Sequence, residues 1–318
     1  MEKPINNEII NAYETIKPLI RKTPFLKSTY FSKLLNGEIF FKLENLQVTG
    51  SFKLRGALNK LLSLSSKQRK LGVISASTGN HGSALAYGAN RLGIQCSIIV
   101  PKEISKSKLK IMKGYVADIE HYGIDCIQCE KKAKMISLHS GRTYVSPYND
   151  YQVIVGQGTA GLEIGSQTRP LDIIFISVGG GGLISGVGTY LKSLWPNLKI
   201  VGCSPENSAV MIESIKAGKI LQLESKNTIS DGTAGGIEKD TITFSLCKNL
   251  IDETILLSEK EIKDAMKIYI KNENQIIEGA AGTVVAGMIK MKSRLKNKKV
   301  GVIICGGNIN LGTLKEII

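Results

Sequence analysis

The segment "NLQVTGSFKLRGALNK", residues 45–60, holds a lysine whose position could make it reactive. Ser51 is a plausible N-cap, which places Lys53 at the second position of a predicted helix, where the helix dipole disfavours an ammonium and lowers the pKa of the amine. A neutral amine is what Schiff-base chemistry requires. The alternative is a solvated surface lysine, which describes most other lysines of the chain and stays open for Lys53 on this segment alone.

Four consecutive glycines, Gly179, Gly180, Gly181 and Gly182, follow an apolar run that predicts a buried strand ending at Val178. A helix is predicted to begin just after them. Glycine backbone approaches an anion closely and a helix N-terminus offers unpaired N–H groups, so the pattern predicts a phosphate site. No G-x-G-x-x-G register fits and no G-K-[ST] follows, which favours a phosphate compound smaller than a dinucleotide. Glycines that only let strand and helix pack closely are the alternative.

A second strand, turn and helix is predicted in "GVISASTGNHGSALAYGANRLG", residues 72–93. It gathers Ser77, Thr78, Asn80 and His81 at a helix N-terminus. Hydroxyls, an amide and free backbone N–H groups can hold a carboxylate there. An ordinary capped helix start explains the same residues equally well.

Two cysteine patterns could also carry chemistry. In "VGVIICGGNINLG", residues 300–312, a buried strand delivers Cys305 to its carboxyl end, where α/β proteins bind ligands; free cysteines are, however, often simply buried. Cys126 and Cys129 have redox or zinc spacing, but no second pair accompanies them and they fall on a predicted helix, so a structural role is favoured. The "SEKE" segment, Ser258 to Glu261, predicts a capping box.

Short β-branched apolar runs alternate with amphipathic stretches along the chain, for example "GVISAS", "CSIIVP", "DIIFISVG" and "KIVGCSP". This alternation predicts an α/β fold with parallel strands covered by helices on both faces. About four strand-helix units lie between residues 70 and 149, and a second set begins at Leu171. Because "EIFFKLE" also predicts a strand before residue 70, we expect a small domain, 70–149, inserted into a larger one, 1–69 and 150–318.

Composition narrows the class of protein. The chain has 318 residues, is 42% hydrophobic and carries six scattered cysteines with no apolar leader, which favours a reducing, cytoplasmic compartment over a disulfide framework. The uncharged run 173–191 is interrupted by glycines, so it predicts strand, loop and helix and no membrane span. The formal charge of +15 comes from lysines spread along the chain and favours a solvated surface over a nucleic-acid site.

In order along the chain, "SFKLRGA", "STGNHG", "GQGTAGLE", "GGGGL" and "CGGN" closely resemble the serine/threonine dehydratase and serine racemase family, which are fold type II pyridoxal-phosphate enzymes. The similarity extends from about Asn6 to Leu311. It implies a fold like that of the tryptophan synthase β-subunit, with two lobes that are open, twisted, mostly parallel sheets, and pyridoxal 5′-phosphate as the cofactor.

The resemblance also implies residue roles. Lys53 would form the Schiff base with the cofactor and move the substrate Cα proton. The implied cofactor site contains Lys53, Phe52, Asn80 near the ring's 3′ oxygen, Gly179 to Gly182 at the phosphate, Leu183, and Cys305 at the pyridine nitrogen. The implied substrate site contains Ser77, Thr78, Asn80, His81 and Tyr148.

The implied reaction is α,β-elimination from a β-hydroxy amino acid, with L-threonine or L-serine as the expected substrate and a 2-oxo acid and ammonia as products. Dehydration of a rarer hydroxy amino acid, as in hydroxyectoine breakdown, stays open because "DGTAGGIEKDTITF" resembles that branch. Serine racemisation stays open as well: racemases of this family carry a catalytic serine, the acid/base on the second face, where this chain has Thr78. Threonine keeps the hydroxyl for this catalytic role but adds a methyl group, which disfavours racemisation.

A β-replacement synthase fits less well, because its loop differs from "GNHG". No metal is expected, since Ser204 and Val210 stand where the racemase has carboxylate ligands. We expect no nucleic-acid or membrane partner, and a homo-oligomer, dimer or tetramer. A non-catalytic protein that binds nucleic acid or phosphate through the glycines is the rival from another class; it has no need of Lys53.

Overall fold

The computed structural model describes residues 6–103, 109, 112–115, 117–124 and 126–318. The strands are β1 (Phe25–Lys27), β2 (Glu38–Leu43), β3 (Val73–Ala76), β4 (Cys96–Val100), β5 (Asp118–His121), β6 (Thr143–Tyr144), β7 (Ile173–Ser177), β8 (Lys199–Pro205), β9 (Glu253–Leu257) and β10 (Lys299–Ile304). The α-helices are α1 (Asn6–Ile16), α2 (Thr29–Leu35), α3 (Lys53–Leu62), α4 (Ser66–Leu71), α5 (Asn80–Arg91), α7 (Cys126–Ser140), α8 (Tyr151–Gln167), α9 (Gly182–Leu194), α10 (Val210–Ala217), α11 (Thr243–Leu250), α12 (Glu259–Glu273), α13 (Gly279–Lys290) and α14 (Leu311–Lys315). Short 3-10 helices occupy Lys17–Leu19, Glu44–Leu46, Glu206–Ser208, Asp231–Thr233 and Lys292–Arg294.

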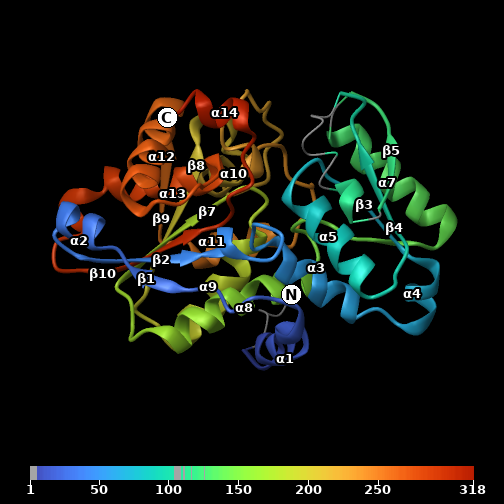
Figure 1. The fold of residues 1–318 in the computed structure, drawn as a ribbon, viewed down its shortest axis with the longest axis horizontal. Helices are drawn as coiled ribbons and strands as arrows, with labels where there is room; N and C mark the ends of the chain where they lie inside the picture. Colours follow the sequence, from blue (N-terminus) through green and yellow to red (C-terminus); the bar gives the residue numbers. More distant parts are fainter. Residues whose placement is uncertain (1–5, 104–108, 110–111, 116, 125) are drawn as a thin grey trace.

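The larger sheet has the strand order β1-β2-β10-β7-β8-β9. Only β1 runs antiparallel to its neighbour; the other pairs are parallel. Helices α12 and α13 lie on one face and α8 and α9 on the other (Figure 1). Every residue of β7 is buried, because a parallel strand covered on both faces has no solvent side.

The smaller sheet has the order β5-β4-β3-β6, all parallel. Its residues alternate between two apolar clusters. Val73 and Ile98 join the cluster on the α5 side, whereas Ile74 and Ile99 pack with Cys129 of α7. The predicted α/β class, with two mostly parallel sheets, is confirmed, and so is the capping box that begins α12 at Ser258.

The segment before residue 70 contributes β1 and β2 to the larger sheet, and the chain returns to that sheet at β7. This order supports an inserted small domain, whose boundaries at 69 and 149 stay a prediction. Helix α3 was not expected to pack as it does: its residues Leu54, Ala57, Leu58 and Leu61 share one apolar cluster with Leu85 and Ala89 of α5. The helix that carries Lys53 therefore lies between the two sheets (Figure 1).

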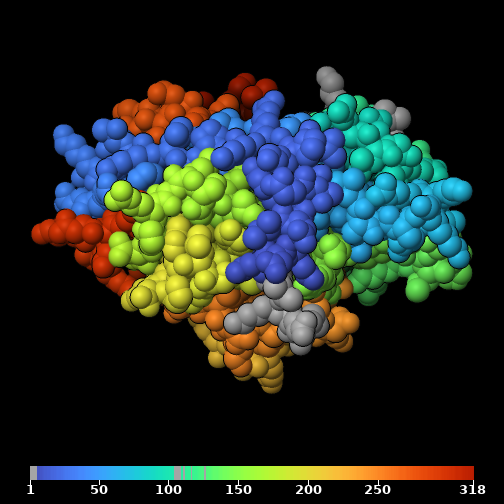
Figure 2. Space-filling model, turned by 90° about the horizontal axis from the view of Figure 1, so that it is seen from below, coloured from blue at the N-terminus to red at the C-terminus, as the bar shows by residue number. Residues whose placement is uncertain are grey.

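Helix α1 and the dark-blue segment that follows it lie across the middle of one face of the molecule, as Figure 2 shows. Helix α1 packs there against α8, burying Ile9 and Ala12 with Val155. Among the helices of the described residues, none is both long enough and apolar enough to span a bilayer.

Candidate active site

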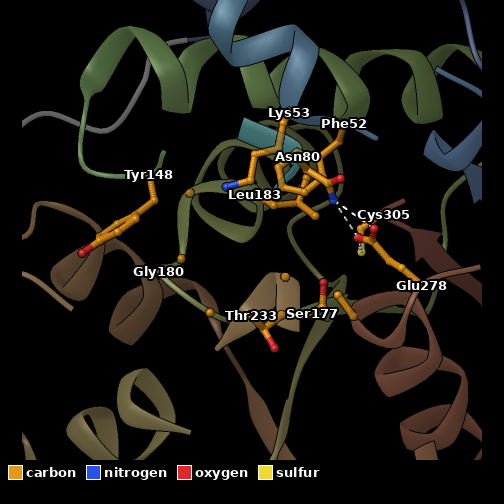
Figure 3. Close-up of a pocket in the computed structure, with 15 residues that line it drawn as sticks. Phe52, Lys53, Asn80, Tyr148, Ser177, Gly180, Leu183, Thr233, Glu278 and Cys305 are labelled. Carbon is orange, nitrogen blue, oxygen red and sulfur yellow. Dashed lines mark hydrogen bonds between the residues drawn. The ribbon is translucent and has the colours of Figure 1, made fainter. Parts of the chain in front are cut away.

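A pocket opens where β7 and β10 end and where α3, α5 and α9 begin (Figure 3). Such a meeting of strand carboxyl ends and helix N-termini is the usual ligand site of an open α/β sheet. The pocket is lined by Phe52, Lys53, Asn80, Tyr148, Ser177, Gly179, Gly180, Gly181, Gly182, Leu183, Gly232, Thr233, Glu278, Ala280 and Cys305.

Lys53 is the first residue of α3, and its Nζ donates a hydrogen bond to the Pro147 carbonyl at 2.9 Å. The residue is partly exposed, but its ammonium is enclosed by protein atoms, and this desolvation lowers the pKa to about 8. The direction of this shift agrees with the prediction from the sequence, but its main cause is burial and not the helix dipole. A substantial fraction of this amine is neutral near physiological pH.

The predicted N-cap was wrong. Phe52 precedes the helix without a side-chain cap, and the buried Ser51 hydroxyl has no hydrogen-bond partner. Ser51 instead forms a β-bridge with Gly306, and the Phe52 N–H donates to the Cys305 carbonyl at 3.0 Å. This long-range pairing determines the backbone around Ser51 and holds the start of α3 against the end of β10.

The glycine loop has no room for side chains. A Cβ on Gly180 would lie 2.3 Å from the Tyr148 ring, and one on Gly179 would lie 2.8 Å from the Thr233 backbone. Gly181 has φ +83° and precedes α9. Backbone N–H groups at the start of a 13-residue helix and an open Gly loop form an anion cradle.

Asn80 is the first residue of α5 and the only one of the four predicted residues at this helix start that lines the pocket. Ser77 and Thr78 lie just before the helix and are partly buried. The His81 ring is buried, its Nε2 lies 3.0 Å from the Val145 carbonyl, and burial lowers its pKa to about 3. His81 is therefore neutral, and its side chain contacts its own lobe.

Cys305 follows β10, is buried, and has a pKa raised by burial, so its thiol keeps its proton. Its Sγ lies 3.8 Å from Oε1 of Glu278. Glu278 precedes α13, and burial raises its pKa to about 7. Both of its oxygens accept from Nδ2 of Asn80 at 2.9 Å (Figure 3). Sequence analysis missed Glu278, because a single Glu before "GAAG" carries no chemical signature.

The protein-family model described as "Pyridoxal-phosphate dependent enzyme" matches residues 16–306 of this chain. The chain belongs to this family. It is 38% identical to L-threonine ammonia-lyase of Thermotoga maritima over 98% of this chain and 77% of that protein. It is also 38% identical to serine racemase of Schizosaccharomyces pombe, over 97% of this chain and 95% of that protein. The crystal structure of serine racemase from Dictyostelium discoideum matches with TM-score 0.89 and 37% identity, covering 96% and 99% of the two chains.

Members of the family depend on pyridoxal phosphate, and the pocket fits this cofactor. The glycine loop offers its cradle to a phosphate, Lys53 offers an amine of lowered pKa to an aldehyde, and Asn80 and Cys305 offer polar groups to a ring. Phe52 and Leu183 add apolar wall. All the cofactor residues expected from the sequence therefore lie around one pocket.

Other predicted features lie elsewhere. Cys129 is buried and its Sγ donates to the Tyr122 carbonyl at 3.1 Å, while the side chain of Cys126, the first residue of α7, lies outside the described residues. In the described part of the chain, no group of three or more His, Cys, Asp or Glu could hold a metal ion. The Ser204 hydroxyl donates to the Val178 carbonyl at 2.6 Å.

Proposed function

We propose that this protein is a pyridoxal-phosphate-dependent ammonia-lyase that eliminates water from L-threonine or L-serine and releases a 2-oxo acid and ammonia. The observation that carries this proposal is the buried Lys53 amine, with its pKa of about 8, in a pocket that also holds the protonated Cys305 thiol. The similarity to L-threonine ammonia-lyase supports the substrate class.

Each residue has a role in this proposal. The Lys53 amine accepts the substrate Cα proton, since an amine of pKa about 8 exchanges protons readily near neutral pH. Ser77, Thr78 and the backbone near His81 bind the substrate carboxylate at the N-terminus of α5, and Tyr148 borders the substrate. The bound cofactor supplies an electron sink for charge that develops at Cα. Cys305 holds its proton and presents a neutral group, which suits elimination better than a long-lived carbanion.

Racemisation is the second candidate. The Thr78 hydroxyl at the start of α5 and the similarity to serine racemase of Schizosaccharomyces pombe favour it. The methyl group of Thr78 disfavours the acid/base role that serine has at this position in racemases. Dehydration of a rarer hydroxy amino acid is the third candidate, supported by the resemblance of "DGTAGGIEKDTITF", residues 231–244, to that branch.

Proton NMR in deuterated buffer separates these reactions. The protein, saturated with pyridoxal phosphate, is incubated with L-threonine, L-serine and D-serine in separate tubes, and Lys53→Ala is the control. We expect oxobutyrate or pyruvate from the L-substrates and none from the variant. Deuterium at Cα without 2-oxo acid would overturn the ammonia-lyase and favour the racemase. No change in any tube would direct the search to rarer hydroxy amino acids.

We also propose a cytoplasmic homo-oligomer, a dimer or tetramer. Five of the cysteines, Cys96, Cys129, Cys203, Cys247 and Cys305, are free and buried, which suits a reducing compartment. Light scattering of the purified protein would measure the oligomer directly.

A further inference from the structure

Asn308 is an exposed residue that makes three hydrogen bonds around the pocket without lining it. It lies three residues beyond Cys305. Its side-chain Nδ2 donates to the Thr49 carbonyl at 2.9 Å and to Oδ1 of Asn80 at 2.8 Å. Its backbone N–H donates to Oε2 of Glu278 at 3.3 Å. The Asn308 amide also packs against Gly50: a Cβ added to Gly50 would lie 2.4 Å from Oδ1 of Asn308.

These contacts fix the orientation of two side-chain amides, first that of Asn308 and then that of Asn80. Both hydrogens of the Asn308 NH2 group have acceptors, and a flipped amide would place its oxygen against two other oxygens, those of Thr49 and Asn80. The Asn80 oxygen is thereby occupied by a donor. The NH2 group of Asn80 must then face Glu278 and the pocket, and its Nδ2 is 2.9 Å from both carboxyl oxygens of Glu278.

We propose that Asn308 is a positioning residue for the cofactor site: it holds the Asn80 oxygen so that the Asn80 NH2 group is presented to the pocket. Without Asn308 only Glu278 would hold the Asn80 amide, and near neutral pH the partly protonated Glu278 carboxyl can donate to the Asn80 oxygen as well as accept from its NH2 group. The inference rests on the proposed role of Asn80, which is to donate to an oxygen of pyridoxal phosphate.

The test measures the affinity of cofactor-free protein for pyridoxal phosphate by equilibrium dialysis. We expect Asn308→Ala to raise Kd about three- to tenfold, the usual worth of one hydrogen bond. Asn310→Ala is the matched control: it lies two residues on and its side chain caps α14 through the Thr313 N–H, away from Asn80. The control should bind pyridoxal phosphate as the unmodified protein does.

A double-mutant cycle distinguishes positioning from a general structural effect. If Asn308 acts through Asn80, then Asn308→Ala should have no further effect on Kd in an Asn80→Ala background. Additive effects of the two substitutions, or an unchanged Kd in Asn308→Ala alone, would overturn the inference. An unchanged Kd in Asn80→Ala would refute the cofactor role of Asn80 itself, and the inference with it.

Asn308→Asp adds a pH signature. An ionised aspartate cannot donate to Oδ1 of Asn80, whereas a protonated one can, so the Kd of Asn308→Asp relative to that of Asn308→Ala should fall as the pH is lowered from 8 to about 4. The charged and titratable groups around this position are Glu278, Lys53 and Cys305. Because an ionised aspartate interacts with Glu278 whereas alanine does not, the same ratio is also measured in a Glu278→Gln background, where the pH dependence should persist. A ratio independent of pH would contradict the proposed donor role.

Discussion

Lys53 and Glu278, which both line the pocket, have pKa values shifted toward their neutral forms. Burial lowers the pKa of Lys53 to about 8 and raises that of Glu278 to about 7. Desolvation disfavours the charged form of each group, so it lowers the pKa of an amine and raises the pKa of a carboxyl. At pH 7 about half of the Glu278 carboxyl and about a tenth of the Lys53 amine are therefore neutral, and the neutral amine is the form that can accept a proton.

Glu278 should make the stability of the cofactor-free protein depend on pH. The unfolded carboxyl ionises near 4.5, whereas the folded one keeps its proton to about 7, so its contribution to stability is lost as the pH rises through this window. Glu278→Gln removes this loss. We expect the free energy of unfolding of the variant, relative to the unmodified protein, to increase by up to about 3 kcal/mol between pH 4.5 and 7.

Urea unfolding of both proteins without cofactor, at several pH values, measures this difference. A difference that stays constant over the window, or that falls with rising pH, would show that Glu278 ionises normally in the folded protein.

Site residues could be predicted where chemistry is encoded in neighbouring positions. The four glycines and Lys53 stand out because each is interpretable within one strand-turn-helix segment. Glu278 and Asn308 could not be predicted in this way, since their partner Asn80 is 198 and 228 residues away. The Ser51 N-cap failed for the same reason: a β-bridge to Gly306 overrode a local preference.

At the scale of single elements, the glycine loop should tolerate no added methyl group. In Gly180→Ala the new Cβ would lie 2.3 Å from the Tyr148 ring, so the ring or the loop must move. We expect at least tenfold weaker binding of pyridoxal phosphate, measured by dialysis. Gly114→Ala is the control, because its Cβ would meet nothing within 4 Å. Equal affinities of the two variants would show that the loop does not hold the phosphate.

A fully buried ionic cluster joins α3 to β2 and α8. Arg55, two residues after Lys53, donates to both oxygens of Glu44, each at 2.8 Å, and to those of Glu163 at 3.0 and 2.8 Å. Lys42 completes the cluster with a 2.5 Å contact to Glu163. Two positive and two negative charges balance, so removal of one cation leaves an uncompensated buried carboxylate.

Arg55→Met should therefore destabilise the protein by about 3 to 5 kcal/mol. Arg294→Met provides a matched control, because Arg294 also binds a carboxylate with two hydrogen bonds, to Glu253 at 2.6 and 2.8 Å, but on the surface. We expect little change in the melting temperature of that variant. Comparable losses in both variants, by thermal unfolding, would contradict a special role for the buried cluster.

For the whole molecule, the pattern of apolar runs sufficed to predict two mostly parallel sheets, because strands covered on both faces leave a continuous hydrophobic signal. It did not reveal that α3 packs against both lobes. An amphipathic segment specifies that one face is buried, not which partner buries it, and Leu58 and Leu61 meet α5 only in the folded chain.

The two lobes are also linked at the edge of the pocket. Lys134 of α7 lies 2.8 Å from Glu238, which belongs to the loop between the 3-10 helix at 231–233 and α11. The Glu238 N–H donates to the Tyr148 hydroxyl at 2.9 Å, and its carboxylate accepts from Asn149 at 3.0 Å. The Lys134 ammonium on the small lobe therefore holds the loop that contains Glu238. That loop in turn contacts Tyr148, a proposed substrate-binding residue.

Lys134→Met should weaken this link without unfolding either lobe, since partly exposed ion pairs contribute little to stability. We expect a nearly unchanged melting temperature and cofactor content, and a KM for the amino-acid substrate raised about threefold. The control is Lys132→Met on the same helix, which also lies over a tyrosine ring but pairs with Glu120 inside the small lobe. An unchanged KM, or the same rise in the control, would count against the link.

Glu238→Gln examines the same link from the other lobe. If the two charges act as a pair, this variant should raise KM by a similar factor, and the double variant should add nothing further. High salt should bring the KM of the unmodified protein toward that of the variants, because partly exposed pairs are screened. A KM that responds to Glu238→Gln but not to Lys134→Met would instead place the role of Glu238 in its contact with Asn149.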